Sequence, residues 1–420
     1  MKQKVIIIGG GFAGVEFIKT IDKTLFDVLL IDKINHHQFQ PLFYQVATSQ
    51  IEPSSISFPL RFIFKGIKNL DIRLAEVYDI IPELNKVATS AGEYTYDILV
   101  IATGCKTNFF NNNKIEQHSF TLKTTYDAIS IRNQIISVFE SILIANETEL
   151  KRLFNLVIVG AGPTGVELAG AFAEIKKYIL PKDYQGIDFS KFTIFLIEGS
   201  DKILNAMSEK SSNTSADYLT GMGVKIITGT FVKDYDGNSA TLSDGSTIPT
   251  ATLIWAAGVK GNRIKGLPDE LWVSNDRLLV DRFNKLNTYE NIYAIGDIAL
   301  MTTPKYPKGH PQVANVAINQ AKLLSKNLKK SILKKSLIEY EYKDLGSMAT
   351  IGRNKAVVDL PYFNFKGYFA WLVWMFLHLM LILTVRNKII IFINWAWSYI
   401  TKNSSLRLIL KSDTEKNVSS

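Results

Sequence analysis

The chain opens on the stretch that decides its fold, Val5-Ile6-Ile7-Ile8-Gly9-Gly10-Gly11-Phe12-Ala13-Gly14. Aliphatic, mostly β-branched residues run directly into Gly-x-Gly-x-x-Gly, the pattern of a buried parallel strand that turns tightly into a helix. Gly9 permits the turn, Gly11 lets a pyrophosphate approach the backbone, and Gly14 lets the helix lie close to the strand. The sequence therefore predicts a dinucleotide whose phosphates lie at the helix N-terminus.

A second copy of this pattern begins at Leu156 and runs to Gly165. Gly14-Val15-Glu16 is echoed by Gly165-Val166-Glu167, so the chain contains an internal repeat. Two such fingerprints imply two bound dinucleotides. The sequence predicts an α/β fold with two Rossmann-like domains.

An acidic residue closes the second predicted strand of each repeat. Phe26 to Ile31 ends at Asp32, and Phe192 to Ile197 ends at Glu198. Such an acid accepts hydrogen bonds from ribose hydroxyls. Glu198 lies farther from its glycines than usual because residues 176–190 insert a helix extension and a loop. Its charge favours NADH over NADPH, although Lys202 lies close by.

Three further strands end in turns that can reach a nucleotide. They are Tyr96 to Gly104, Thr252 to Gly258, and Thr288 to Asp297. Asp297 is placed to meet ribityl or phosphate oxygens, or to cap a helix. The stretch from Ile34 to Thr48 is rich in polar and aromatic residues without periodicity, which predicts a loop and short helix over a ligand, or a packed surface loop. A helix is expected around Thr125 to Ala145.

Length and composition limit the function. A chain of 420 residues should hold two or three domains. Lysine and arginine exceed acids by 48 to 39, a net charge of +9 that suits anionic lipid, anionic substrate or nucleic acid. No basic run with interleaved aromatics appears, which argues against nucleic acid. Cys105 is the single cysteine, so an internal disulfide or Cys-x-x-Cys pair is excluded and a reducing compartment is expected.

The C-terminal region contains two apolar segments. Tyr368 to Val385 has no acidic or basic residue except His378, and Ile389 to Ile400 is nearly as apolar. Four tryptophans and a basic cluster suit a membrane interface; they are Trp371, Trp374, Trp395 and Trp397, with Arg386, Lys388, Lys402, Arg407 and Lys411. As one helix the first segment would measure roughly 27 Å against about 30 Å of hydrocarbon.

Crossing the bilayer would translocate that basic cluster, against the positive-inside rule. We therefore expect two helices lying in one leaflet; a buried helical hairpin or a homodimer contact is the alternative. Residues 1–4 enter the first strand at once and leave no room for a signal peptide, so the body of the protein is expected on the cytoplasmic face.

These motifs, in this order, resemble the flavoproteins with two dinucleotide-binding domains. Narrower signatures resemble the type II NADH dehydrogenases, the non-proton-pumping NADH:quinone oxidoreductases of respiratory chains; they are residues 39–48, 257–259 and 309–314, and Leu345-Gly346 to Val357. The resemblance covers essentially the whole chain. It implies FAD in residues 1–120 and 260–345, NADH in 121–259, a membrane-anchoring region in 346–420, and menaquinone or ubiquinone as acceptor.

The resemblance also implies which residues form the sites. The FAD-binding residues would be Gly9, Gly11, Phe12, Ala13, Gly14, Asp32, Gln45, Thr48, Val77, Thr103, Gly104, Gly296, Asp297 and Ala314. The NADH-binding residues would be Gly160, Gly162, Pro163, Thr164, Gly165, Glu167, Glu198, Ala257 and Gly258. The catalytic residues would be Glu167, Asn315, Asn319 and Gln320.

One motif departs from the family pattern. The family carries Ala-Gln-x-Ala-x-Gln beside the quinone, whereas this chain has Asn315 and Asn319 in place of both glutamines, followed by Gln320. Positions 315 and 319 still share one helix face. Asparagine has the same amide group as glutamine but a shorter reach, so we expect the position of the quinone to change. The alternative is that both amides contact only neighbouring backbone groups.

The resemblance implies that Glu167 lies near the nicotinamide and quinone. However, Glu16 occupies the equivalent position of the first repeat, where a favourable interaction with the helix dipole is enough to explain a glutamate. His36, His37 and His310 could donate to flavin or quinone, yet no metal-ligand spacing connects them.

Two other functions remain open at this point. One is a soluble flavoprotein reductase of a ferredoxin-like protein or oxygen, and the other is a nucleotide-sensing flavoprotein. A disulfide reductase is excluded because Pro41 to Gln45 contains no cysteine beside the flavin.

Overall fold

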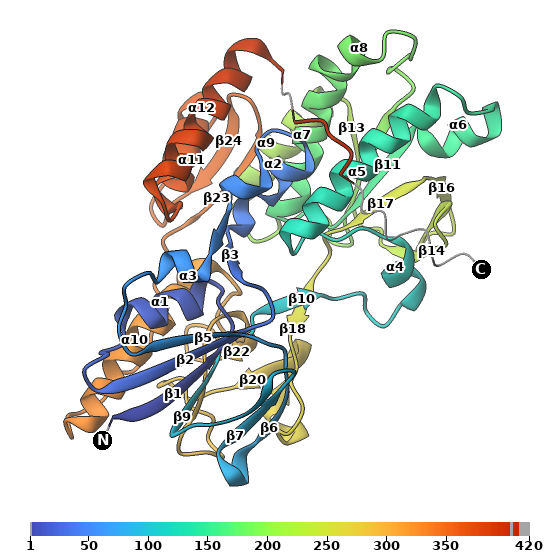
Figure 1. Ribbon diagram of the computed structural model, residues 1–420. Coiled ribbons are helices and arrows are strands. Elements are labelled where there is room, and N and C mark those ends of the chain that lie inside the picture. Colours follow the sequence, from blue (N-terminus) through green and yellow to red (C-terminus); the bar gives the residue numbers. More distant parts are fainter. Residues whose placement is uncertain (1, 404–405, 411–420) are drawn as a thin grey trace. The chain divides into compact units, whose positions relative to one another are not determined.

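The computed structural model describes residues 2–403 and 406–410 (Figure 1). The chain divides into two compact units, each built from several separate segments. Unit 1 comprises residues 1–38, 57–106 and 259–343. Unit 2 comprises residues 39–56, 107–258 and 344–420.

The core of unit 1 is a parallel five-stranded sheet of order β21-β9-β1-β2-β5. Its strands are β1 (Gln3–Ile8), β2 (Phe26–Asp32), β5 (Leu70–Leu74), β9 (Ile98–Ile101) and β21 (Ile292–Ala294). Helices α1 (Phe12–Thr20) and α10 (Ala314–Ile332) pack against each other and bury apolar residues with the sheet.

Smaller elements complete unit 1. They are the antiparallel meander β6 (Val77–Ile81), β7 (Lys86–Thr89) and β8 (Gly92–Thr95), the pair β3 (His36–Gln38) and β4 (Ser57–Pro59), α3 (Leu60–Ile63), and the sheet of β19 (Trp272–Val273), β20 (Arg277–Leu279) and β22 (Ala299–Leu300). Strands β10 (Cys105–Thr107) and β18 (Val259–Gly261) pair with each other where the chain passes between the units.

Unit 2 is built around a parallel four-stranded sheet of order β13-β12-β11-β17. Its strands are β11 (Asn155–Val159), β12 (Thr193–Ile197), β13 (Val224–Ile227) and β17 (Thr252–Trp255). Its other elements are α2 (Phe43–Ala47), α4 (Asn113–His118), α5 (Thr125–Ile142), α6 (Glu147–Leu153), α7 (Pro163–Tyr178), α8 (Leu180–Asp183), α9 (Glu209–Gly221), and the meander β14 (Val232–Tyr235), β15 (Ser239–Leu242) and β16 (Thr247–Pro249).

The internal repeat is visible in the topology. The order β5-β2-β1-β9 in unit 1 matches β13-β12-β11-β17 in unit 2, and each sheet is accompanied by a three-stranded antiparallel meander. This confirms the predicted α/β fold with two Rossmann-like halves. The insertion after the second fingerprint is the end of α7, then α8 and a loop, as the sequence predicted.

The C-terminal part of unit 2 packs directly on α7. It contains the antiparallel strands β23 (Ser347–Gly352), β24 (Lys355–Asp359) and β25 (Asn364–Lys366), then α11 (Tyr368–Leu381) and α12 (Val385–Thr401). A Cβ added at Gly170 of α7 would lie 1.8 Å from the backbone oxygen of Ile351 in β23. The lack of a side chain at Gly170 is therefore what lets helix and strand meet.

The first apolar C-terminal segment is not one continuous helix. Helix α11 ends at Leu381, and Ile382 takes an extended conformation. The Thr384 hydroxyl then accepts the amide N–H of Asn387 and starts α12. As a result α11 is roughly 21 Å long, shorter than expected. Within residues 2–403 and 406–410, no helix is both long and apolar enough to traverse a bilayer.

The tryptophans of these helices do not all face outward as expected for an interfacial belt. Trp374 and Trp395 are only 2% and 7% exposed, whereas Trp397 is 63% exposed. The two buried rings lie with their centroids 6.2 Å apart, and Trp371 stacks on Tyr399 at a centroid distance of 5.4 Å, so both pairs join α11 to α12. Packing within unit 2 therefore uses three of the four tryptophan rings, and Lys411 of the basic cluster lies outside the described residues.

Candidate active site

The two glycine turns have nearly the same geometry. A Cβ at Gly14 would lie 1.9 Å from the backbone oxygen of Gly9, and a Cβ at Gly165 would lie 1.9 Å from that of Gly160. Gly9 and Gly160 have φ angles of 106° and 96°, in the region that favours glycine. Each helix can thus start against its own strand only because glycine occupies these positions.

The middle glycines leave the phosphate positions open. A Cβ at Gly11 or at Gly162 would have no heavy atom within 4 Å among the described residues. These glycines are the N-caps of α1 and α7, and no described side chain caps either helix start. Free backbone N–H groups at a helix start bind phosphate. The residues present therefore fit the pyrophosphate of one dinucleotide in each unit.

The acid of each repeat lies at its strand end and holds its glycine turn. An Asp32 carboxylate oxygen accepts the Gly10 amide at 2.5 Å, and an oxygen of Glu198 accepts the Ala161 amide at 2.6 Å. The other Glu198 oxygen accepts from the amide and hydroxyl of Ser200. Burial raises the pKa of Asp32. The position of both acids suits a ribose, and that role stays a prediction.

Four of the other predicted FAD residues of unit 1 follow strands of its parallel sheet: Thr103 and Gly104 come after β9, and Gly296 and Asp297 come after β21. Asn262 donates to the Thr103 backbone oxygen at 2.7 Å, and the Gly296 amide donates to Gln320 Oε1 at 2.8 Å. Asp297 lies in a short 3₁₀ turn and accepts the Cys105 thiol at 3.0 Å, so it does not cap a helix.

Several predicted residues have structural contacts that account for their side chains. Gln320 is 1% exposed, and its Oε1 is used by Gly296. Its Nε2 has no hydrogen-bond partner among the described residues. Asn319 donates to Asn315 Oδ1 at 2.8 Å, so these two amides share a face of α10 as predicted. Val77 begins β6 and Ala314 begins α10.

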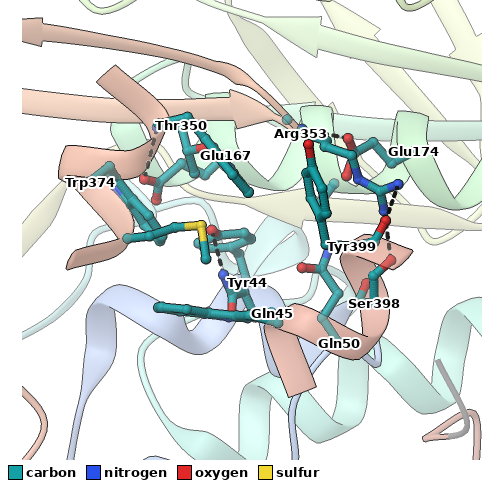
Figure 2. Close-up of a pocket in the computed structure, with 15 residues that line it drawn as sticks. Tyr44, Gln45, Gln50, Glu167, Glu174, Thr350, Arg353, Trp374, Ser398 and Tyr399 are labelled. Atoms are coloured by element: carbon teal, nitrogen blue, oxygen red, sulfur yellow. Dashed lines mark hydrogen bonds between the residues drawn. The ribbon is translucent and has the colours of Figure 1, made fainter. Parts of the chain in front are cut away.

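A pocket in unit 2 brings together residues that are far apart in the sequence (Figure 2). We call it the carboxylate pocket. It encloses about 70 Å³ and is lined by Tyr44, Gln45, Gln50, Glu167, Ala171, Glu174, Thr350, Gly352, Arg353, Trp371, Trp374, Met375, Trp395, Ser398 and Tyr399. A space of this size holds a few water molecules.

Glu167 lies in this pocket beside Thr350 and Trp374 (Figure 2). Burial raises the pKa of Glu167 to about 8. The Thr350 amide donates to its Oε1 at 3.5 Å, a long contact that offsets little of this effect. No lysine or arginine pairs with it among the described residues. Glu167 is therefore a carboxyl group that carries its proton at neutral pH.

Glu174 lies two turns along α7 on the same face. Its Oε1 accepts the Arg353 amide at 2.6 Å, and burial raises its pKa. The Arg353 guanidinium donates to the backbone oxygens of Ser398 and Tyr399 at the end of α12, as Figure 2 shows. The β23–β24 turn thus connects α7 to α12.

Helix α2 contributes the opposite wall. Gln45 Nε2 donates to the Tyr44 hydroxyl at 2.9 Å, and Trp395 Nε1 donates to Gln45 Oε1 at 2.7 Å. Burial, and then the nearby Glu167, raise the pKa of Tyr44 well above its usual value. The Thr48 hydroxyl donates to the Tyr44 backbone oxygen. The side chains of Gln45 and Thr48 are thus held within unit 2, and their contacts with FAD stay a prediction.

Two of the three predicted histidines, His37 and His310, are buried beside aromatic rings, whereas His36 is part-exposed and its Nδ1 lies 2.9 Å from Asn35 Oδ1. His37 Nδ1 donates to the Gly10 backbone oxygen at 3.1 Å, and burial lowers the pKa of His37 to about 4. His310 lies among Tyr306, Tyr340 and Tyr342, and no described group bonds its ring nitrogens. No group of three metal-ligating side chains occurs in the part of the chain that the structure describes.

Most residues of the carboxylate pocket are not among the predicted site residues, and Tyr44, Glu174 and Arg353 are three of them. A usable signal existed for Glu174, because Glu167, Gly170, Ala171 and Glu174 follow the spacing of one helix face. Glu167 and Glu174 lie on the same face as Gly170, and a glycine on a helix face is where another element can approach closely. The spacing therefore indicates that both carboxyl groups lie near a close packing contact. No local signal marks Arg353, whose role depends on the packing of β23 and α12.

Comparison with known proteins agrees with this geometry. Residues 3–321 match the pyridine nucleotide-disulphide oxidoreductase family, and residues 345–402 match the NDH2 C-terminal domain. The chain is 32% identical to the type II NADH:quinone oxidoreductase Ndh of Mycobacterium tuberculosis, over 95% of this chain and 89% of that protein. It is 27% identical to the type II NADH:quinone oxidoreductase of Staphylococcus aureus, over 85% and 89%.

Solved structures show the same fold. NDH2 from Plasmodium falciparum, solved in complex with NADH, superposes with a TM-score of 0.89 at 24% identity, covering 98% of this chain and all of that one. The sulfide:quinone oxidoreductase of Aquifex aeolicus gives a TM-score of 0.72 at 20% identity, covering 96% of each chain. Two glycine turns, their strand-end acids and the matched C-terminal domain together show that this chain belongs to the type II NADH dehydrogenases of the pyridine nucleotide-disulphide oxidoreductase family.

Proposed function

We propose that this protein is an FAD-dependent enzyme that oxidises NADH and reduces a membrane quinone by two electrons. The observation that carries the proposal is the combination of two open glycine turns with a buried, proton-bearing carboxyl in unit 2. The family relationship favours this function over a soluble reductase or a nucleotide sensor.

Each nucleotide would be held by its own repeat. Gly9, Gly11 and Gly14 with Asp32 would bind FAD, whereas Gly160, Gly162 and Gly165 with Glu198 would bind NADH. When bound, FAD supplies the two-electron chemistry that connects a nicotinamide to a quinone. Glu198 favours NADH because its carboxylate would repel a 2′-phosphate.

Glu167 would supply the proton side of the reaction. Reduction of a quinone to a quinol consumes two electrons and two protons. A carboxyl with a pKa of about 8 holds its proton at Oε1 or Oε2 at neutral pH and can release it when a neighbouring base forms. Water in the carboxylate pocket provides a route for replacing that proton. Asn315 and Asn319 would position the quinone from α10 of unit 1.

Helices α11 and α12 would bind the membrane surface. Phe369, Leu372, Phe376 and Met380 recur along α11 at helical spacing and are 40% to 66% exposed. Exposed apolar side chains at this spacing suit a helix that lies in one leaflet. We place the protein peripherally on the cytoplasmic face of the inner membrane, with menaquinone or ubiquinone arriving from the bilayer.

Steady-state turnover tests the proposal. The purified full chain, in mild detergent and supplied with FAD, should oxidise NADH only when a short-chain quinone is added, with NADPH a much poorer donor. A soluble ferredoxin reductase would instead prefer a one-electron protein acceptor. A sensor would bind NADH and turn over barely at all, and either result would refute the proposed activity.

A further inference from the structure

A second cavity of unit 2 lies on the other side of Glu174 and Arg353. We call it the Tyr178 cavity. It encloses about 390 Å³, within the range of small-molecule sites. Its wall includes the end of α7, the β23–β24 turn and the end of α12. The side chains used below are Lys177, Tyr178, Arg353, Lys355, Tyr399 and Lys402.

Three cations converge on one ring of this cavity. Lys402 Nζ lies 5.1 Å from the centroid of the Tyr178 ring, Lys177 Nζ lies 5.4 Å from it, and the Arg353 guanidinium carbon lies 5.9 Å from it. Lys355 of the same wall lies 5.6 Å from the centroid of Tyr218. Cation–π contacts of this kind stabilise each cation only modestly. They do not explain why four positive charges line one cavity.

None of these cations forms a salt bridge with a described residue. Among residues 2–403 and 406–410, no carboxylate oxygen lies within 4.0 Å of the side-chain nitrogens of Lys177, Arg353, Lys355 or Lys402, whereas Arg407 nearby in the sequence pairs with Asp183 at 2.6 Å. Glu174 is the one carboxyl in the wall, and it accepts the Arg353 backbone amide. Four cations against one acid leave the cavity with a net positive charge. Like charges gathered in a partly enclosed space repel, and a bound anion offsets that repulsion.

Arg353 and the two lysines differ in their hydrogen bonds. Its guanidinium donates to the backbone oxygens of Ser398 and Tyr399, which fixes it against the C-terminal end of α12. The ammonium groups of Lys177 and Lys402 make no hydrogen bond to a described residue. These two groups are therefore free to contact a ligand.

The position of the cavity indicates the source of the anion. Tyr399 and Lys402 belong to the last turn and the C-cap of α12. The same end of that helix exposes Trp397 and Ile400, which are 63% and 78% exposed. Tyrosine, tryptophan and lysine at one end of an apolar helix are typical of the headgroup level of a membrane.

We propose that the Tyr178 cavity binds the phosphate group of an anionic phospholipid, with Lys177 and Lys402 as its principal contacts. This rests on the proposed membrane binding of α11 and α12. The lipid would hold the end of α12 at the membrane surface, because Lys402 and Arg353 both belong to that contact. Inorganic phosphate carries the same charged group without acyl chains. Comparing it with a phospholipid therefore distinguishes a lipid site from a site for free phosphate.

Calorimetric titration of the full-length protein in a non-ionic detergent tests the site. Three probes are used: dihexanoyl phosphatidylglycerol, dihexanoyl phosphatidylcholine and inorganic phosphate. We expect one saturable site for phosphatidylglycerol, with phosphatidylcholine and inorganic phosphate each weaker by about tenfold or more. Equal affinity for the two lipids would overturn the proposal. Equal affinity for inorganic phosphate would identify a free-anion site and overturn the lipid source.

Charge reversal locates the site. Lys177→Glu/Lys402→Glu should weaken phosphatidylglycerol binding by about tenfold or more, and Lys177→Gln/Lys402→Gln should weaken it less. The matched control is Lys210→Glu/Lys233→Glu, which makes the same change in net charge at two exposed cations outside the cavity and outside the C-terminal basic cluster. If the control loses as much affinity as the cavity variant, general electrostatics explains the binding and the site is refuted.

The outcome is independent of the quinone reaction. Each preparation is also assayed for FAD content, thermal unfolding and NADH oxidation. Loss of lipid binding in a folded, FAD-containing variant supports the cavity whatever its turnover. Absence of quinone-dependent turnover in the parent protein would refute the proposed function, while the comparison of the lipids would still decide the cavity.

Discussion

Glu16 and Glu167 occupy the same slot of the two repeats but have opposite surroundings. In unit 1, Glu16 of α1 is part-exposed and lies 3.5 Å from the ammonium group of Lys322 on α10. In unit 2, Glu167 of α7 is buried beside Thr350 and Trp374, and its pKa is raised to about 8. The same Gly-Val-Glu sequence thus yields a surface ion pair in one unit and a proton-bearing carboxyl in the other.

The partner that packs on each helix explains the difference. Helix α1 contacts α10, which presents a lysine to Glu16. Helix α7 contacts β23, which approaches closely because residue 170 is glycine. Strand β23 and α11 cover Glu167 and supply no positive charge within reach among the described residues. A residue's chemistry here follows from long-range packing rather than from its local motif.

The largest expected effect is on stability. In the unfolded chain Glu167 titrates near the ordinary glutamate pKa of 4.5, and in the folded protein near 8, so the folded state holds the extra proton between these values. Stability should therefore fall as pH rises from 4.5 to 8, by on the order of 4 kcal/mol from this group. Glu167→Gln should remove this contribution to the pH dependence. The measurement is the urea midpoint of the variant and of the parent, each determined at pH 5 and at pH 8.

The control for this measurement is Glu16→Gln. The urea midpoint of Glu16→Gln should differ from that of the parent by the same amount at pH 5 and pH 8, because Glu16 is part-exposed and paired with Lys322. If Glu167→Gln and Glu16→Gln give the same pH dependence, Glu167 is not a buried neutral acid.

Turnover should separate the same two residues. Glu167→Gln keeps the size of the side chain and removes its exchangeable acid, so the quinone-dependent kcat should fall by about 100-fold at pH 7. Glu16→Gln should change kcat by less than about twofold, because an exposed ion pair contributes little. A Glu167→Gln enzyme with the parent kcat would remove this residue from proton transfer. Stopped-flow measurement of flavin reduction by NADH, expected to be less affected, distinguishes loss of proton supply from loss of NADH binding.

The strand-end acids extend the comparison to nucleotide choice. Glu198→Arg should raise the KM for NADH by about tenfold and admit NADPH, because the carboxylate would be replaced by a cation that attracts a 2′-phosphate. Glu198→Gln, which removes the charge alone, is the matched variant and should give a smaller shift. The ratio of kcat/KM for the two nucleotides is the readout. An unchanged ratio in Glu198→Arg would show that Glu198 does not contact the ribose.

The smallest expected effect concerns α10. Asn315→Gln together with Asn319→Gln would restore the longer amides of the family pattern, and should change the KM for quinone by about threefold while leaving that for NADH unchanged. The two amides now bond to each other, so lengthening both preserves their chemistry. Equal changes in both constants would mean that this helix does not line the quinone site.

Local sequence predicted the parts of the site that are local. The glycine turns and the positions of Asp32 and Glu198 follow from a strand, a turn and the next strand end, so they could be read directly. Asn315 and Asn319 share a helix face because their spacing is four. These features depend on contacts within one supersecondary unit.

The carboxylate pocket could not be predicted in the same way. The sequence predicts that Trp374 and Trp395 face a membrane, but the two rings pack against each other and line the pocket. Gln45 of α2 supplies the buried hydrogen-bond partner of Trp395. Ile382 breaks the first apolar segment, although no glycine or proline marks the position. The burial of the two tryptophans and the break at Ile382 both depend on tertiary packing, which the hydropathy of the sequence does not predict.

The most direct test of the central claim is an anaerobic titration of the purified, full-length protein. We predict that it binds FAD and is yellow, that one equivalent of NADH bleaches the flavin absorbance, and that menaquinone or ubiquinone restores it. A protein that takes up no flavin, or whose bleached flavin is not reoxidised by either quinone, would contradict the account.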